Sequence, residues 1–278
     1  MTPPRWTSSG AAPSVAASMV TSLGRTALSF ILYLGELALL VWETCVAIFT
    51  APLRWGLFMR QIVEIGWRSQ MVVLVTGAFT GAVLTAQTYF QFSTLGMKSA
   101  TGSVVAVSLF RELGPVLTGL MVAGRVGAAI AAEIGTMKVT EQIDALRSLA
   151  VNPTEYLVVP RVLALVLAMP LLVAESVGLG IVSSYIVGVQ VLDISGPFFL
   201  ENLYKYVGAR DIKMALSKGL AFGIVIAFIA CHQGLNAKEG AVGVGRAPTE
   251  AVVISSLSIL IMNFFLTFLL NMLFPYGL

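Results

Sequence analysis

The chain has 278 residues, of which 57% are hydrophobic and only 11% are charged, and its formal net charge is +3. Soluble domains carry about 25% charged residues, so this composition excludes an ordinary soluble protein and indicates an integral membrane protein. The two cysteines, Cys45 and Cys231, lie in apolar segments without a CxxC pattern. Neither a disulfide framework nor a thiol metal site is therefore expected.

The N-terminal quarter differs in character from the rest. Residues 1–24 contain an AxA-like patch, but the apolar core that a signal peptide needs does not precede it. We therefore interpret these residues as a mobile polar tail. Residues 25–69 are expected to form an interfacial helical region. Within it, residues 26–50 are long enough to cross a bilayer, yet Glu36 and Glu43 are seven residues apart and share one face. This favours a helix lying in the membrane interface, although the sequence does not decide whether the segment spans fully.

Residues 70–278 are predicted to form an all-α membrane domain with five spans. A helix needs about 20 predominantly apolar residues to cross the hydrocarbon core, and the alternating segments of a β-barrel are not seen. Kinks are expected at Gly114-Pro115 and Pro170, and polar loops over 191–212 and 234–248. The predicted spans cover residues 70–92, 103–132, 157–190, 213–233 and 250–274.

The distribution of Lys and Arg predicts the orientation. Placing residues 1–69, 133–161 and 234–248 on one side gathers ten basic residues there, against four in the opposite loops. Because basic residues are retained on the cytoplasmic side, the N-terminus is predicted to be cytoplasmic and the C-terminus to lie on the other side.

Four charges lie in the predicted second span and its extension: Arg111, Glu112, Arg125 and Glu133. Each would cost roughly 2.5–3.5 kcal/mol at the centre of a bilayer, and less when paired or near the ends. They therefore need partners, an aqueous cavity or an interfacial position. Structural ion pairs within a bundle are one interpretation, and a role in a substrate path or a gating rearrangement is the other.

A row of small residues at spacing four runs through the same segment: Gly119, Ala123, Gly127, Ala131 and Gly135. Small residues at this spacing let a second helix approach closely in a membrane. We expect this face, and Gly119, Gly127 and Gly135 in particular, to pack against another helix.

A short amphipathic helix is predicted over about 139–150, between the second and third spans. Its apolar positions include Ile143 and Leu146, and its polar positions include Glu141, Asp144 and Arg147. A solvated surface helix would show this pattern, but a polar-apolar helix between two long spans is also suited to docking a cytoplasmic partner.

The end of the first predicted span carries polar groups among apolar ones. Leu84, Gln87 and Tyr89 have the mixture that lines a cavity, although an interfacial belt explains Tyr89 equally well. Lower on the same helix, Gly77 and Gly81 allow close packing.

Three apparent motifs are set aside. The sequence GAVGVGRA, residues 240–247, has Arg and Ala where a phosphate-binding loop needs Lys and Ser or Thr, so a flexible turn is expected. His232 is the sole histidine, next to Cys231, and with no third ligand nearby it is interpreted as a packed residue rather than a metal ligand. The serines have no GxSxG elbow or histidine partner, so no catalytic residue, cofactor or metal is expected.

The run RELGPVLTGLMVAGRVGAAIAAEIGTMKVTEQIDAL, followed by AVNP and Pro160-Arg161, closely resembles the MlaE-type permeases. The resemblance covers residues from about 54 to 274. These proteins are membrane subunits of ABC transporters that work with MCE-domain lipid-binding proteins. The resemblance implies a homodimer, an N-terminal elbow helix, five spans and a cytoplasmic coupling helix at Thr140–Leu149 that contacts a separate ATPase subunit, where ATP is bound.

The resemblance also implies the substrate and the location. Phospholipid would sit between the two permease subunits beneath a ring of MCE proteins, in a bacterial inner membrane. The polar groups that end the first span independently lead us to expect Leu84, Gln87 and Tyr89 to line the lipid cavity, and no nucleic-acid partner is expected. Two departures are evident: Lys98 stands where family members carry a carboxylate, and residues 247–253 lack the usual Ala-Thr-Thr pattern. The rival functions are an ion-coupled secondary transporter and a non-transporting anchor for an MCE assembly. The sequence does not decide the direction of transport, the lipid headgroup, the MCE partner or the role of Lys98.

Overall fold

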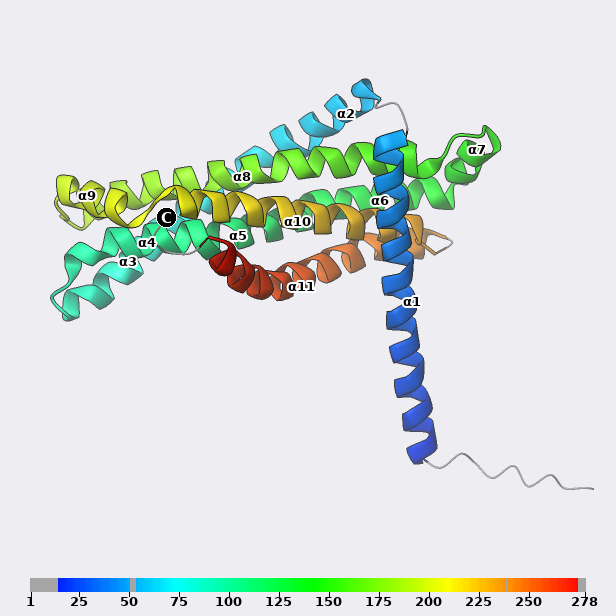
Figure 1. Ribbon diagram of the computed structural model, residues 1–278, viewed down its shortest axis with the longest axis horizontal. Helices are drawn as coiled ribbons and strands as arrows, with labels where there is room; N and C mark the ends of the chain where they lie inside the picture. Colours follow the sequence, from blue (N-terminus) through cyan, green and yellow to red (C-terminus); the bar gives the residue numbers. More distant parts are fainter. Residues whose placement is uncertain (1–14, 51–53, 239, 275–278) are drawn as a thin grey trace, which may run out of the picture.

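The structure, a computed structural model, describes residues 15–50, 54–238 and 240–274, and every element in these ranges is a helix. Five long helices lie side by side, and a sixth, α1 (Val15–Thr50), runs across them (Figure 1). Several of the long helices contain π-helical turns, labelled η. The first long helix of the five comprises α2 (Trp55–Ile62), η1 (Val63–Trp67) and α3 (Arg68–Thr94). The second comprises α4 (Thr101–Ser108), η3 (Leu109–Leu113), α5 (Gly114–Val122), η4 (Ala123–Gly127) and α6 (Ala128–Val139).

The remaining long helices complete the bundle. The third comprises η5 (Thr154–Val158), α8 (Val159–Ile186) and η6 (Val187–Val191), and the fourth and fifth are α10 (Ala209–Leu235) and α11 (Ala241–Leu273). A 3₁₀ turn, η2 (Lys98–Ala100), and two short helices, α7 (Gln142–Ser148) and α9 (Gly196–Tyr206), lie in the connections. In Figure 1, α7 and α9 lie at opposite ends of the bundle.

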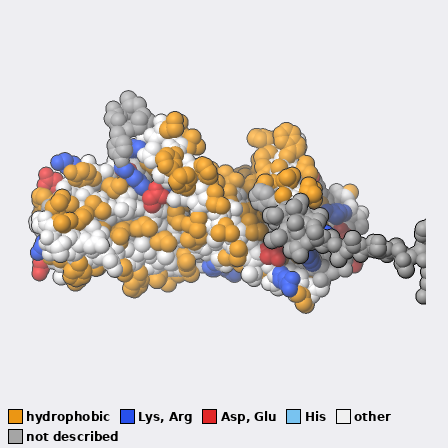
Figure 2. Space-filling view, turned by 90° about the horizontal axis from the view of Figure 1, so that it is seen from below, with side chains coloured by type: hydrophobic (Ala, Val, Ile, Leu, Met, Phe, Trp, Pro, Cys, Tyr) orange, Lys and Arg blue, Asp and Glu red, His pale blue; other side chains and the backbone are white. Residues whose placement is uncertain are grey.

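Six helices in the described residues are long and apolar enough to cross a membrane. Large apolar side chains point outward along them, for example Phe79, which is 68% exposed, and Phe265, which is 64% exposed. The face seen in Figure 2 carries hydrophobic side chains along most of its length, with few charges among them. Such a surface suits lipid rather than water. The prediction of an all-α multi-pass membrane protein is confirmed.

The helices are longer than the predicted spans, and three predicted boundaries differ. Residues 55–69 continue directly into α3 as one helix of 40 residues. The predicted polar loop over 191–212 contains α9, whose second residue, Pro197, has a backbone angle already set for a first helical turn. The predicted tail is helical from Val15 onward, and residues 1–14 lie outside the described part of the chain.

The glycine-rich segment is helical rather than a flexible turn, because α11 begins at Ala241. Gly243 and Ala247 are buried, and a Cβ on Gly135 of α6 would lie 3.8 Å from the Cβ of Ala247. Close packing against α6 therefore offsets the low helix propensity of glycine in this segment.

Both predicted kink sites coincide with irregular or crowded helix packing. The π-helical turn η3 ends one residue before Gly114-Pro115. Pro170 lies inside α8, and a Cβ on Gly219 of α10 would lie 3.2 Å from its Cα atom. The backbone groups that such irregular turns release must find partners inside the protein.

The closest helix pair is α3 with α8. On α3, Gly77, Gly81 and Thr85 are buried at spacing four and face Ser176, Gly180 and Ser184 of α8. A Cβ added at Gly77 would overlap the backbone of Ser176, and one added at Gly81 would overlap the backbone of Gly180. The hydroxyls of Thr85 and Ser184 are hydrogen-bonded at 2.6 Å. This is the small-residue packing expected in membranes, here with a polar contact at one end.

Candidate functional site

A groove runs along the half of α3 that is nearer α9. One hollow of about 650 Å³ is lined by Leu84, Gln87, Leu113 and neighbouring residues of α3. A second, of about 520 Å³, shares Val83 and Gln87 with it. The exposed lining is mainly apolar, and the amides of Gln87 and Gln91 belong to both hollows, which suits a ligand that is mostly hydrocarbon with a small polar part.

The structure separates the three predicted lining residues. Leu84 and Gln87 line the groove, but Tyr89 lines neither hollow. Its ring makes an edge contact with Phe90 at 6.0 Å, and the Lys98 ammonium lies 5.5 Å from its centroid. Lys98 therefore forms a cation–π contact with Tyr89.

Arg111 and Glu112 belong to a network of two acids and two bases near the groove. The Arg111 Nε lies 2.6 Å from Asp211 Oδ1, and the Lys218 Nζ lies 2.9 Å from Glu112 Oε2. Lys218 also donates to the Arg111 carbonyl at 2.6 Å, in the turn before Pro115. The four charges sum to zero, as low-dielectric surroundings require.

Polar side chains of α11 complete this network. Asn263 donates to Glu112 at 2.8 Å and Thr267 donates to it at 3.0 Å. Sequence reasoning missed Lys218 and Asp211. Lys218 could have been found as a base well inside the predicted fourth span, where an acid on another span would have to compensate it. Its side chain is fully buried.

Arg125 and Glu133 lie in the half of the bundle nearer α7, away from that network. Arg125 donates to the Ser69 hydroxyl at 2.6 Å. Glu133 forms an ion pair with Arg161 at 2.7 Å, and Arg161 also donates to the Leu157 carbonyl at 2.8 Å. The four charges predicted as one group are therefore divided between two places.

The predicted small-residue face packs on α10 and α11, mainly through side chains. A Cβ on Gly119 would lie 3.2 Å from the Phe222 ring, and one on Gly127 would lie 3.4 Å from Ile226 Cγ2. The expected packing at Gly127 is present, and the atoms nearest to it belong to the side chains of Ile226 and Ala230. Backbone contact is instead made by Gly77 and Gly81 of α3.

The short helix α7 divides its predicted residues between two faces. Ile143 is 1% exposed and belongs to the hydrophobic core, and Leu146 is half-buried against it. These two apolar residues hold the helix to the bundle, so they do not face outward. Glu141, Asp144 and Arg147 are exposed, and so is Leu149, which sequence reasoning passed over.

Helix α1 is attached to the α7 end of the bundle through its two acids. Glu36 lies 3.3 Å from His232 Nε2 and accepts from Asn236 at 3.2 Å, and Glu43 accepts from Thr154 at 3.3 Å. His232 is thus a packed residue with a carboxylate partner. In the described residues no group of three or more His, Cys, Asp or Glu could hold a metal ion.

The fold is that of a multi-pass helical membrane protein. The family model for Permease MlaE matches residues 58–269. The chain therefore belongs to the MlaE permease family.

Relatives with assigned names agree with this family. A probable ABC transporter permease protein of Rickettsia felis is 44% identical over 250 residues, covering 90% of this chain and 96% of the relative. One from Synechocystis sp. is 43% identical, covering 76% of this chain and 81% of the relative. Protein TRIGALACTOSYLDIACYLGLYCEROL 1, chloroplastic, of Arabidopsis thaliana is 37% identical, covering 81% and 64%.

Proposed function

We propose that this chain is the membrane subunit of an ATP-driven transporter that moves phospholipid between the inner membrane and a periplasmic assembly of MCE proteins. It is a non-catalytic subunit without a cofactor of its own, and a separate subunit binds and hydrolyses ATP. The observation that carries the proposal is the mainly apolar groove, with glutamine amides in its lining, on the half of α3 nearer α9.

The chemistry of the groove supports a lipid substrate. Acyl chains are accommodated by Phe79, Val83 and Leu84, and Gln87 offers hydrogen bonds where a headgroup meets the chains. The name of the Arabidopsis thaliana relative contains trigalactosyldiacylglycerol, a glycerolipid, which supports a lipid substrate. A second copy of the chain, facing the exposed apolar row of α3, would close the groove and make a homodimer with the lipid between its subunits.

Leu84→Trp is expected to reduce lipid transport to background while ATP hydrolysis continues. Leu84 is half-buried at the wall of the groove, so an indole there would occupy the volume that an acyl chain needs. Transport of a fluorescent phospholipid by the reconstituted complex measures the effect. The matched control is Leu257→Trp, at an exposed position on α11 outside the groove. Normal transport by Leu84→Trp would place the lipid path elsewhere.

The ATPase is proposed to dock on the exposed side of α7. This helix lies at one end of the bundle, its apolar side is anchored by Ile143, and its charged side is free for a partner. ABC permeases work with ATPase subunits, and the relatives named as such support one here. The α7 end would then be cytoplasmic, and the MCE assembly would sit over the α9 end.

Replacing Glu141 and Asp144 together by Lys is expected to remove most of the ATPase that co-purifies with the permease. Asp144 pairs with the exposed Arg147 at 3.2 Å and with the half-buried Lys138 at 3.7 Å, and Asp144 is itself half exposed, so folding should change by less than about 1 kcal/mol. Quantitative pull-down measures docking. Glu201→Lys on α9, at the other end, serves as the control. Undiminished co-purification in the double variant would contradict this docking site.

Helix α1 is proposed to be the elbow helix, lying in the cytoplasmic interface. It crosses the bundle instead of running beside the spans, and Glu36 and Glu43 are both directed to polar partners at the α7 end (Figure 1). With α1 in the interface, five helices cross the membrane. The N-terminus is then cytoplasmic and the C-terminus periplasmic.

A further inference from the structure

Two glutamine side chains of α3 line the groove without a hydrogen-bond partner among the described residues. Gln87 and Gln91 each belong to both hollows, and both side chains are exposed. By contrast, the hydroxyls of Thr80 and Thr94 donate to backbone carbonyls of their own helix, each at 2.7 Å. The two amides are therefore free to donate to a ligand in the groove, whereas these two hydroxyls are not.

The spacing of the two amides suits a ligand with two neighbouring acceptors. Residues four apart on a helix lie on one face, with their Cβ atoms about 5–6 Å apart. A diacyl glycerolipid has two ester carbonyls on adjacent carbons of its glycerol, and each carbonyl oxygen accepts hydrogen bonds from an amide N–H. Two amides on one face thus match the two carbonyls in number and in chemistry.

The depth of the two residues places their amides at the level of these esters. The helix Trp55–Thr94 has its midpoint between residues 74 and 75. At 1.5 Å per residue, Gln87 lies about 19 Å from this midpoint toward α9, and Gln91 about 25 Å. Helical side chains lean toward the N-terminus of their helix, which brings both amides closer to the hydrocarbon edge, about 15 Å from the bilayer centre. With the helix centred in the bilayer, the amides lie at the boundary between acyl chains and headgroups.

Helix α8 gives the same depth independently. The Thr85 hydroxyl donates to that of Ser184 at 2.6 Å, so these two residues lie at one level. Ser184 is about 17 Å from the midpoint of the helix Thr154–Val191, and Thr85 is about 16 Å from the midpoint of its own helix. Because Gln87 follows Thr85 by two residues, its depth does not depend on where a single helix begins or ends.

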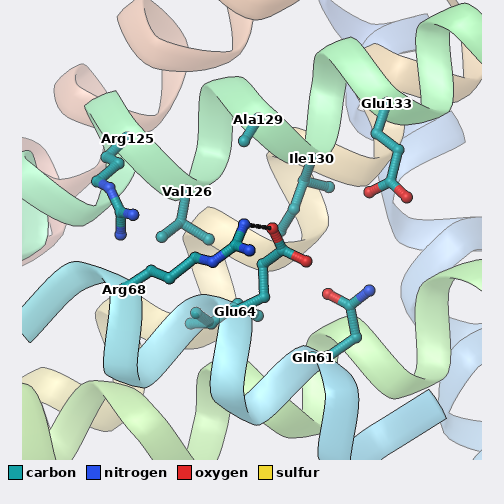
Figure 3. A pocket seen from close by; sticks show the side chains of 9 residues that line it. Gln61, Glu64, Arg68, Arg125, Val126, Ala129, Ile130 and Glu133 are labelled. Carbon is teal, nitrogen blue, oxygen red and sulfur yellow. Dashed lines mark hydrogen bonds and ion pairs between the residues drawn. The ribbon is translucent and has the colours of Figure 1, made fainter.

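The groove offers no charge to a headgroup. Among the described residues that line the two hollows, none is charged. A charged pocket does lie between the α2–η1–α3 helix and the η4–α6 helix, in the half nearer α7, where Arg68 pairs with Glu64 at 2.7 Å (Figure 3). Two acids and two bases line that pocket, so its charges balance. Recognition in the groove therefore depends on the uncharged parts of a lipid.

We propose that Gln87 and Gln91 donate to the two ester carbonyls of a diacyl glycerolipid, one amide to each carbonyl. The site then selects ester-linked lipids over their ether-linked analogues, whatever the charge of the headgroup. Phe79 and Leu84, nearer the bilayer centre on the same helix, lie beside the acyl chains. The inference rests on the proposed function and adds which part of the lipid the protein recognises.

The test compares two lipids on the full-length protein, purified in mild detergent with the subunits that accompany it. Dioleoylphosphatidylglycerol and its diether analogue have the same headgroup and chain length, but only the first has ester carbonyls. Native mass spectrometry measures the retention of each, and the Leu84→Trp variant gives the retention that does not depend on the groove. We expect the diester to be retained about tenfold over the diether, the modest effect of two neutral hydrogen bonds formed in competition with water.

Replacing both glutamines by methionine, in Gln87→Met with Gln91→Met, removes the donors while keeping the side-chain length. The ratio should fall close to one, because retention of the diester decreases and that of the diether does not. The double variant should fold normally, since neither amide has a partner among the described residues. Gln190→Met is the matched control: Gln190 is exposed in η6, at the same end of the bundle but outside the groove, so the tenfold ratio should persist.

Three results would overturn the proposal: a ratio near one in the wild-type protein, a tenfold ratio that persists in the double variant, or a diester preference that survives in Leu84→Trp. Phosphatidylethanolamine, whose headgroup has no net charge, should show the same diester preference. If the double variant changed the preference between the two headgroups but not between the two linkages, the amides would bind the headgroup and the ester assignment would be wrong. Failure of the proposed function is seen separately, as normal transport by Leu84→Trp.

Discussion

Gly81→Leu is expected to abolish assembly of the folded protein. A Cβ at this position would overlap the carbonyl and the Cα atom of Gly180, and neither backbone atom can rotate away as a side chain could. Overpacking a core costs about 1–3 kcal/mol when neighbours can shift. With backbone on both sides the cost should exceed this range. Fluorescence-detected size-exclusion chromatography of the expressed variant in detergent measures the yield of folded protein.

Substitutions at two other glycines serve as controls for the effect of Gly81→Leu. Gly124 has nothing within 4 Å of an added Cβ, so Gly124→Leu should give a normal yield. Gly127 faces the Ile226 side chain, which can adjust, so Gly127→Leu should lie between the two. A normal elution profile for Gly81→Leu would contradict the close backbone contact between Gly81 of α3 and Gly180 of α8.

Lys218→Met is expected to destabilise the protein by roughly 3 kcal/mol, since removing one member of a buried ion pair leaves the other uncompensated. The estimate takes the lower end of the range for buried pairs, because the Glu112 side chain is 40% exposed whereas that of Lys218 is fully buried. The substitution also leaves the Arg111 carbonyl without the ammonium that donates to it. Thermal unfolding in detergent measures the change.

A double-mutant cycle with Glu112→Gln isolates the ion pair. The double variant should recover part of the stability lost in Lys218→Met, because it no longer holds an unpaired carboxylate. Lys213→Met is the matched control: it makes the same substitution on the same helix at an exposed position and should change stability by less than about 0.5 kcal/mol. Strictly additive effects of the two single substitutions would mean that Glu112 and Lys218 do not interact.

Features that depend on local composition were predictable from the sequence. Apolar length predicted the spans, and spacing alone identified the close-packing glycines Gly77 and Gly81 on α3. Two acids seven residues apart predicted that α1 would bring Glu36 and Glu43 to one face, and both acids have partners at the same end of the bundle. In each case the relevant residues are neighbours along one helix, so helical periodicity contains the information.

Features that depend on contacts between distant helices were not predictable. Glu112 and Lys218 belong to different spans, and only the packing of α10 brings them together. Ile143 could have faced a partner protein or the bundle, since an amphipathic pattern does not say what covers its apolar face. The glycine-rich start of α11 has low helix propensity, and its helical form comes from packing on α6.

The backbone contact between α3 and α8 restricts how the groove can change its width. Sliding one helix along the other would drive side chains into the glycine backbones, so shear motion at this contact is blocked. Helices α3 and α8 are therefore expected to move together as one rigid body, and Leu84 in the groove wall moves with them. Widening of the groove would then require a rotation of the pair, and we expect the φ/ψ changes in the connections at its α9 end, residues 95–97 and 192–195.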